Sequence, residues 1–360
     1  MPDFVRARPL GARNPLVRAF AFALLACALL LTALAPTNAR AEGPELIPYS
    51  ETIEGEPDYR MAAGGPTCMI KQNGYAVCVG LPDWASNVPA DLGKPKGLAV
   101  GQLGACGIKQ DNTLRCFGNN TYGENNVPAN VGAVKQVAYG RIHVCAIRSS
   151  DRNVVCWGNN ENHELDIPAN LGPVKEISAG TQGTCAIKQD DTVACWGTGL
   201  VGQFDFPAGF TAKSVSLGSG VSCAIKLDDM PWCTGQFPNG ASVVPPASIG
   251  MVRQVNVGSY HACGIRRANN EMACWGVETQ NDASLNPPAG LGEVEQIAVG
   301  EGTACAVKLA GGAPVCWGIN FYGQPYNTNQ YDNPAVPTPT PVPTPTATPE
   351  PTPVPTPTPT

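Results

Sequence analysis

Hydrophobic residues recur along this chain in short stretches, each interrupted after a few positions by a polar turn. The fullest unit, residues 134–168, reads Val-Lys-Gln-Val-Ala-Tyr-Gly, then His-Val-Cys-Ala-Ile-Arg, then a polar turn, Val-Cys-Trp-Gly, an Asn-rich loop and Ile-Pro. Stretches rich in Val, Ile and Ala that are bounded by Gly, Asn, Asp and Pro are typical of β-strands and hairpins. The pattern predicts an all-β chain of short strands.

Each unit contains two cysteines, separated by 10 or 11 residues. The segments between them, such as 107–115 and 69–77 with its Asn-Gly turn, are typical of hairpins, so the two cysteines face each other across antiparallel strands. In a non-hydrogen-bonded pair the Cα atoms are about 4.5 Å apart, which a disulfide can span. We expect seven local disulfides, and the pairs are Cys68 with Cys78, Cys106 with Cys116, Cys145 with Cys156, Cys185 with Cys195, Cys223 with Cys233, Cys263 with Cys274, and Cys305 with Cys316.

A metal site is the alternative use of these cysteines. Zinc sites of this kind need Cys-x2-Cys spacing or additional histidines, and the chain has only three histidines. We therefore predict no metal and no other cofactor. In the chain-entropy model each bridge, which closes a loop of about eleven residues, stabilises the fold by somewhat under ~3 kcal/mol.

The units repeat with a period near 40 residues. Their first cysteines follow one another at 38, 39, 40, 38, 40 and 42 residues. Six units also have a glycine five residues before that cysteine, at Gly101, Gly140, Gly180, Gly218, Gly258 and Gly300. A sheet of this size cannot bury its own apolar face, so the units must stack. The period fits a propeller or a linear solenoid, and the count of seven favours closure into a ring.

The repeat carries a family resemblance. Val-x-Gln-Val-Ala-x-Gly-x-x-His-x-Cys-Ala-Ile followed by Cys-Trp-Gly-x-Asn resembles the repeat of the regulator of chromosome condensation family in a cysteine-bearing form, over roughly residues 58–326. The resemblance implies a seven-bladed β-propeller. The fold class that we predict is therefore all-β, a seven-bladed β-propeller with one disulfide in each blade.

Two units depart from the pattern. The first has Cys78-Val79-Gly80 without the aromatic residue, and Ala63 where the others have the spaced glycine. The fifth has Cys233-Thr234-Gly235, with Trp232 directly before the cysteine. Residues 45–48, Glu-Leu-Ile-Pro, look like the end of a full repeat, and we hypothesise that they complete the last blade and close the ring.

The two ends of the chain differ in composition from the repeats. Residues 1–41 combine a basic start with Arg6, Arg8, Arg13 and Arg18, an apolar run at 19–35 and Ala39-Arg40-Ala41, and predict a secretory signal peptide. An uncleaved anchor and lipidation at Cys27 are the alternatives, and all three place the rest of the chain outside the cytoplasm. Residues 42–331 are the predicted propeller. Residues 332–360, rich in Pro and Thr, predict an extended linker or stalk that associates with the cell envelope or continues to an anchor.

The charge of the chain bears on its partners. The whole chain has a formal net charge of −6, and removal of residues 1–41 leaves 18 Lys and Arg against 28 Asp and Glu. A surface of that sign repels phosphate backbones, so we predict no nucleic-acid partner. The disulfides and the signal indicate a secreted or cell-surface protein, which we expect to be a monomer.

Candidate catalytic residues are few. His143 and His261 share one repeat position and are interpreted as structural, and His163 lies in a polar surface loop. The Asp pairs at 190–191 and 228–229 sit at predicted hairpin tips, where Asp favours the turn. The tryptophans of the Cys-Trp-Gly units, at 157, 196, 275 and 317, are expected to pack between blades. No catalytic motif is present in the sequence, so we predict that the protein is not an enzyme.

The residues between the repeated glycine and the first cysteine vary from unit to unit. In a propeller, copies of one connection gather on one face, so this varied set predicts a binding surface. The candidate binding residues are Gln102, Arg141, Gln182, Tyr260 and Glu301. Tyr and Arg are the types enriched at interface hot spots. The alternative for each residue is an ordinary solvated loop.

These observations predict a secreted or cell-surface module that recognises an extracellular protein or glycan. The resemblance supports binding in general, because family members serve as guanine-nucleotide exchange factor, photoreceptor and β-lactamase inhibitor. The signal and the disulfides exclude a nuclear exchange factor. An inhibitor of a secreted enzyme is a narrower version of the same hypothesis. One alternative is an extracellular enzyme acting on a polysaccharide or other polymer, with a site in the central channel or on one face, which a carboxylate cluster in the channel would favour. The other is a passive head on a stalk.

Overall fold

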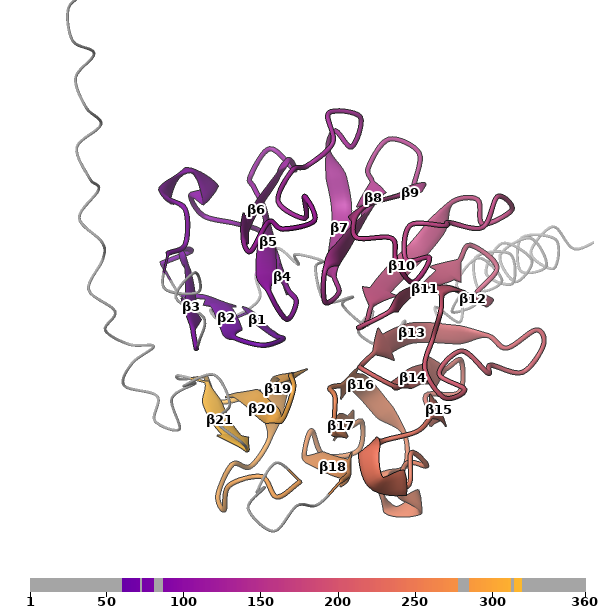
Figure 1. Ribbon diagram of the computed structural model, residues 1–360. Helices are drawn as coiled ribbons and strands as arrows, with labels where there is room; N and C mark the ends of the chain where they lie inside the picture. Colours follow the sequence, from indigo (N-terminus) through magenta and orange to yellow (C-terminus); the bar gives the residue numbers. More distant parts are fainter. Residues whose placement is uncertain (1–59, 72, 81–86, 278–284, 312–313, 319–360) are drawn as a thin grey trace, which may run out of the picture. The chain divides into compact units, whose positions relative to one another are not determined.

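The computed structural model describes residues 60–71, 73–80, 87–277, 285–311 and 314–318, which form seven three-stranded antiparallel sheets (Figure 1). The strands are β1 (Arg60–Ala63), β2 (Thr67–Ile70), β3 (Ala76–Val79), β4 (Gly97–Val100), β5 (Gly104–Ile108), β6 (Leu114–Gly118), β7 (Val134–Tyr139), β8 (His143–Arg148), β9 (Val154–Gly158), β10 (Val174–Ala179), β11 (Gly183–Lys188), β12 (Val193–Gly197), β13 (Ala212–Leu217), β14 (Val221–Lys226), β15 (Pro231–Gly235), β16 (Val252–Val257), β17 (His261–Arg266), β18 (Met272–Gly276), β19 (Val294–Val299), β20 (Thr303–Lys308) and β21 (Val315–Gly318).

Three short 3-10 helices, η2 (Ala90–Leu92), η3 (Pro238–Gly240) and η4 (Ala247–Ile249), lie between sheets. Within the described ranges, no helix has the length and apolar character that crossing a bilayer requires. The predicted signal peptide, the Pro/Thr-rich linker and the hypothesis that residues 45–48 complete the last blade all concern residues outside these ranges.

Each sheet is one blade and consists of three strands that are consecutive in the sequence. The first strands of the blades, from β1 to β19, surround a central channel. In five blades the pairing of the first and second strands shifts at the second residue of the first strand, as at Lys175 between Val174 and Glu176. Such a β-bulge bends the strand and increases its local twist.

The hydrophobic core is divided into seven buried clusters, each shared by two neighbouring blades. One cluster, for example, joins Ile108 of the second blade to Val137 and Val144 of the third. Another joins Met61 of the first blade to Val307 of the seventh. The amide of Gln296 also bonds the backbone of Met61 in both directions, at 3.3 Å. The ring is therefore closed, and the predicted seven-bladed propeller is confirmed.

All seven predicted disulfides are present, one in each blade. The paired cysteines are direct partners in the register of the second and third strands, as Cys145 and Cys156 are, and their Cα atoms are 4.0–4.1 Å apart. Because most of these cysteines are buried between blades, each bridge fixes a hairpin at the place where it packs against a neighbour.

Replacing Cys145 and Cys156 together with alanine is expected to lower the free energy of unfolding by about 2 kcal/mol, because the unfolded chain regains the freedom of a short loop. Urea denaturation of the variant and the wild type measures this difference. Reduced wild-type protein is the control, since it should lose more stability than the double variant. Equal stability of the variant and the oxidised wild type would contradict the prediction.

Candidate functional site

One face of the ring is formed by the turns that join the first and second strands of each blade, and we call it the turn face. Each turn begins with a glycine, and the seven are Gly64, Gly101, Gly140, Gly180, Gly218, Gly258 and Gly300. None of them has a positive φ. A Cβ atom placed on each would instead lie 1.8–2.5 Å from the carbonyl oxygen of the corresponding glycine in the next blade. Glycine is needed here because the seven backbones meet in a circle.

Hydrogen bonds also run around this glycine circle. In four blades the N–H of the residue after the glycine donates to the glycine carbonyl of the next blade, as Arg141 does to Gly180 at 3.3 Å. The bond from Glu301 to Gly64, also 3.3 Å, joins the last blade to the first. The turn face therefore has a rigid backbone frame on which side chains can vary.

In the first blade, the glycine of the circle lies one residue later than the cysteine spacing predicts. Counting back from the first cysteine places Ala63 at the glycine position, whereas the structure places Gly64 there. The reason is that the first turn is one residue shorter, since Ala63 pairs with Thr67 while Val100 pairs with Ala105.

The mouth of the channel opens at the centre of the turn face and holds a cavity of about 80 Å³. Three of the predicted binding residues, Gln102, Arg141 and Glu301, line it. The structure does not bring Gln182 and Tyr260 to the mouth, because they are the second residues after their glycines. The first residues, Thr181 and Ser259, line it instead. Arg141 is exposed, and the other four predicted residues are half-buried on the same face.

The loops that follow the third strands belong to the same face, which the sequence analysis did not predict. The N–H of Asn119 donates to the carbonyl of Leu103 at 2.8 Å, and that of Asn159 donates to Ile142 at 2.9 Å. These bonds tie each loop to the turn of its own blade. The loops carry three exposed hydrophobic residues, which are Tyr122, Val201 and, in the loop after β15, Val244. The regular position of Cys-Trp-Gly-x-Asn in the repeat is the sequence signal from which these loops could have been predicted.

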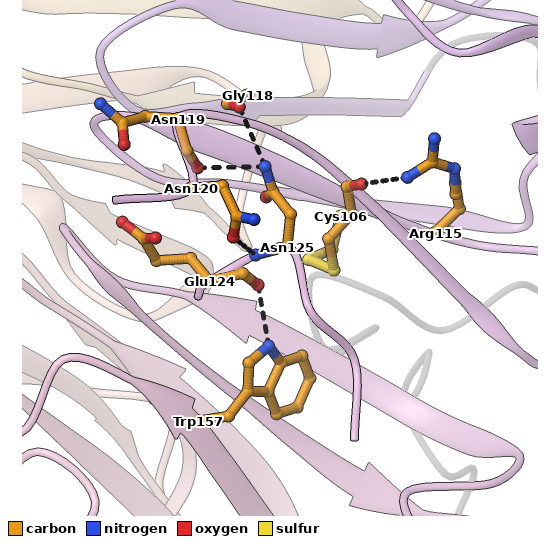
Figure 2. Close-up of a disulfide and its surroundings, with 9 residues drawn as sticks. Cys106, Arg115, Gly118, Asn119, Asn120, Glu124, Asn125 and Trp157 are labelled. Atoms are coloured by element: carbon orange, nitrogen blue, oxygen red, sulfur yellow. Dashed lines mark hydrogen bonds between the residues drawn. A yellow bond between two sulfur atoms is a disulfide. The ribbon is translucent and has the colours of Figure 1, made fainter. Parts of the chain in front are cut away.

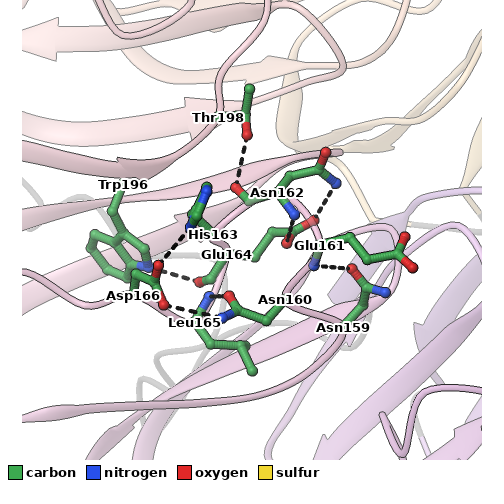
Figure 3. Close-up of polar contacts among 10 residues, drawn as sticks. All are labelled: Asn159, Asn160, Glu161, Asn162, His163, Glu164, Leu165, Asp166, Trp196 and Thr198. Carbon is green, nitrogen blue, oxygen red and sulfur yellow. Dashed lines mark hydrogen bonds and ion pairs between the residues drawn. The ribbon is translucent and has the colours of Figure 1, made fainter.

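The Asn-rich loops are held by their own side chains. In the loop after β6, the Asn125 amide donates to the carbonyls of Gly118 and Asn119, and the Asn125 N–H donates to Asn120 (Figure 2). The loop after β9 has an equivalent hydrogen bond, in which the Asn160 side chain accepts from the N–H of Leu165 (Figure 3). Such side-chain bonds replace regular secondary structure in fixing a loop.

The tryptophans hold these loops by hydrogen bonds to the loop backbone. The indole N–H of Trp157 donates to the carbonyl of Glu124 at 2.8 Å, and that of Trp196 donates to Glu164 at 2.9 Å (Figures 2 and 3). Trp157, Trp196, Trp275 and Trp317 are all buried, so the predicted packing between blades is confirmed. A sugar-stacking role would require exposed rings.

The fifth blade shows how its departure from the repeat is accommodated. Thr234 occupies the tryptophan position, and its hydroxyl donates to the carbonyl of Gly202 at 3.0 Å. Trp232, two residues earlier on the same side of β15, packs with Phe206 and Phe210 at ring-centroid distances of 5.4 and 4.9 Å. The aromatic residue thus still packs on the preceding loop.

The histidines have different environments. His143 is fully buried, and its Nε2 lies 2.9 Å from the Thr184 hydroxyl in the next blade. Burial lowers its pKa to about 4, so the ring is neutral at physiological pH. His261 is buried at the same repeat position, where the next blade has Ala304 in place of the threonine. His163 is exposed and contacts Asp166 at 2.7 Å. The structural interpretation of His143 follows from its inter-blade contact.

The Asp pairs lie at hairpin tips, as predicted. Asp190 accepts hydrogen bonds from the N–H and hydroxyl of Thr192, and Asp191 has a φ of 68° and contacts Lys175. The 228–229 pair follows the same pattern, with Asp228 accepting from the N–H of Met230. These carboxylates therefore stabilise the turns.

The channel below the mouth holds a cavity of about 110 Å³. Among the described residues that line it, Glu176 is the single carboxyl group, and the other polar side chains include Gln136, Ser178, Gln254 and Asn256. Small-molecule sites usually have a volume of roughly 300–1,000 Å³. In the same part of the chain, no group of three or more His, Cys, Asp and Glu residues has a metal-binding arrangement.

Comparisons with known proteins agree with this architecture. The model of the regulator of chromosome condensation (RCC1) repeat matches residues 134–164. No curated protein matches the chain in sequence. The fold is similar to the CRINKLY WD40 ectodomain of the Arabidopsis thaliana receptor kinase ACR4, with 24% identity, a TM-score of 0.62, and coverage of 74% of this chain and 96% of that chain.

Two further solved structures share the fold. The entire ectodomain of the Physcomitrella patens receptor kinase CR4 has 23% identity and a TM-score of 0.61, with 72% of each chain covered. Prp20p from Saccharomyces cerevisiae, described with its binding properties to Gsp1p and histones, has 17% identity and a TM-score of 0.54, with 65% of this chain and 74% of that chain covered. Together with the seven blades, these findings show that the chain is a disulfide-stapled β-propeller whose third unit is similar to the RCC1 repeat.

Proposed function

We propose that this protein is an extracellular binding module that recognises a protein partner through its turn face. The observation that supports the proposal most strongly is the combination of a fixed backbone circle with side chains that vary among the blades. A rigid frame lowers the entropy cost of binding, and variation of the side chains on it provides specificity. The seven disulfides fit the oxidising conditions outside the cytoplasm.

A protein partner fits the turn face better than a small ligand. The cavity at the mouth is far smaller than a usual small-molecule pocket, so most contacts would be made on the surface around it. Exposed Arg141 and Tyr122 are of the types enriched at interface hot spots, and exposed Val201 adds apolar area. Recognition of a glycan remains the second form of the same proposal, in which the half-buried Tyr260 would supply the stacking surface.

The enzyme alternative receives no support from the channel. Two carboxyl groups within reach of one another are required for glycoside cleavage, and Glu176 is the single carboxyl group among the described residues that line this cavity. Its Oε1 accepts hydrogen bonds from the backbone N–H of Val215 and the hydroxyl of Ser214, in a structural contact between blades. We therefore propose a non-catalytic role.

The test is capture of a partner from native extracellular material by the immobilised chain. The double variant Arg141→Ala with Tyr122→Ala is expected to reduce capture at least tenfold, because each such anchor typically contributes more than about 1 kcal/mol. The matched control is Arg152→Ala with Tyr75→Ala, which removes the same residue types from the opposite face. Equal capture by the turn-face variant and the wild type, or a loss limited to the control, would refute the proposal.

A further inference from the structure

The face opposite the turn face is formed by the hairpins that join the second and third strands, and we call it the hairpin face. The hairpins of the second to sixth blades also bond the next blade, since the carbonyl of Asn112, for example, accepts from the N–H of Val134 at 2.8 Å. Equivalent bonds connect Asp191 to Ala212 and Asp229 to Val252. The hairpins therefore lie side by side around the ring.

Basic residues gather on the hairpin face. The repeat places one at the end of every second strand, three positions after the first cysteine, and the seven are Lys71, Lys109, Arg148, Lys188, Lys226, Arg266 and Lys308. A second set lies at the start of the first strands, at the bulge position or its equivalent, and comprises Lys96, Lys135, Lys175, Lys213 and Arg253. Twelve of the 18 Lys and Arg among the described residues thus belong to two rings around this face.

The basic residues are unevenly neutralised. In the fourth and fifth blades they contact hairpin acids, as Lys213 contacts Asp229 at 2.6 Å and Lys226 contacts Asp228 at 2.8 Å. The first three blades carry seven basic residues on this face, Lys71, Lys94, Lys96, Lys109, Lys135, Arg148 and Arg152, against the hairpin acids Asp111 and Asp151. A third acid, Asp91, lies in the same loop as Lys94 and is paired with Arg115. This arc is therefore strongly positive.

Exposed hydrophobic residues share the hairpin face with the basic arc. Leu227 and Met230 flank the tip of the fifth hairpin and are 47% and 38% exposed. Met251, 54% exposed, lies beside that tip because the next residue, Val252, bonds Asp229. Leu309 and Tyr75 are also exposed, and the Tyr75 ring lies 5.3 Å from the Lys94 ammonium. Of the eight exposed large hydrophobic residues among those that the structure describes, five are thus on this face.

From this arrangement we infer that the hairpin face docks on an anionic lipid surface. Lys and Arg side chains are attracted to lipid phosphates, and protruding Leu and Met side chains enter the boundary between headgroups and acyl chains. A soluble polyanion would use the charges and leave the hydrophobic residues in water. The inference is independent of the proposed function, because it concerns the opposite face, and such docking would direct the turn face away from the membrane.

Sedimentation with lipid vesicles tests the inference. The chain from Glu42 onward is mixed with phosphatidylcholine vesicles, with or without about a third phosphatidylglycerol. Binding is expected only to the anionic vesicles, and it should weaken when NaCl is raised from about 0.05 to about 0.5 M. Lys94→Gln with Lys109→Gln should reduce partitioning about 25-fold, because each lysine contributes roughly fivefold. Leu227→Ser with Met251→Ser should reduce it about tenfold.

Two controls accompany these variants. Val244→Ser removes a hydrophobic residue that is 68% exposed outside the hairpins, and it should partition like the wild type. The turn-face variant Arg141→Ala with Tyr122→Ala should also bind vesicles normally, so a failure of the proposed function and a failure of this inference remain distinguishable. The inference is overturned if the anionic vesicles do not bind. It is also overturned if the serine variant binds normally while dextran sulfate competes, since that result indicates a soluble polyanion.

Discussion

Gly258→Ala is expected to lower the free energy of unfolding by about 3 kcal/mol or more, at the upper end of overpacking effects. The added Cβ would lie 1.8 Å from the carbonyl oxygen of Gly300 and 3.1 Å from a Val299 methyl group. Neither neighbour can move alone, because the glycines of all seven blades are in contact around one circle. Chemical denaturation of the variant measures the loss.

Gly292→Ala is the matched control for this prediction. Gly292 has a φ of 70°, and a Cβ there would meet no atom within 4 Å. The substitution therefore carries only the backbone cost of a left-handed residue, about 1 kcal/mol. If the two alanine variants lost equal stability, close contact in the glycine circle would not be the reason for the repeated glycine.

Glu176→Gln is expected to stabilise the protein by about 3 kcal/mol at pH 8 and to have little effect at pH 4. Burial raises the pKa of Glu176 from 4.5 to about 7. The folded chain therefore binds a proton that the unfolded chain has released between these values. Stability that is present below pH 4.5 is lost as the pH rises through 7. Glutamine removes this loss because it has no charge to bury.

Two other blades show why glutamine fits this position. In the third blade, Gln136 accepts from the N–H of Ile177 at 2.9 Å and donates to its carbonyl at 3.0 Å. Gln254 makes the same pair of bonds to Ile297. Ionised Glu176 can only accept, from Val215 and Ser214. The glutamine variant would gain a donor for the carbonyl of Val215.

Thermal unfolding of both proteins between pH 4 and pH 8 measures this effect, and the quantity to compare is the difference between them. His143 contributes in the opposite direction, since its pKa is lowered to about 4 and its contribution is lost as the pH falls from 6.5 through 4. That contribution is common to both proteins and cancels in the difference. A difference that stays constant with pH would show that Glu176 does not titrate as described.

The cysteine spacing explains why the fold could be predicted from the sequence. A separation of 10 or 11 residues fits a hairpin, and seven copies of one period require stacked blades, so both the bridges and the ring followed from local chemistry. The glycine circle could be located but not explained, because its cause is a contact with the next blade. The shift from Ala63 to Gly64 depended on the length of one turn, which the cysteine count does not reveal.

The candidate site was predicted less completely. Gln102, Arg141 and Glu301 line the mouth as copies of one connection should, whereas Gln182 and Tyr260 do not, because adjacent residues of a turn point in different directions. The Asn-rich loops were missed because backbone bonds, such as Asn119 to Leu103, bring them to the turn face. Net charge was also a poor guide to the surface. Eleven of the 28 acids after residue 41 lie outside the described residues, where Lys and Arg are absent, so the hairpin face can be basic.

The claim that the turn face is the recognition surface is tested most directly by hydrogen–deuterium exchange of the chain with and without its captured protein partner. Our account predicts that binding slows exchange in the turns that follow Gly101, Gly140 and Gly180 and in the loops after β6 and β9. The hairpin tips should be unchanged. Protection restricted to the hairpins, with the turns exchanging at their free rate, would contradict the account.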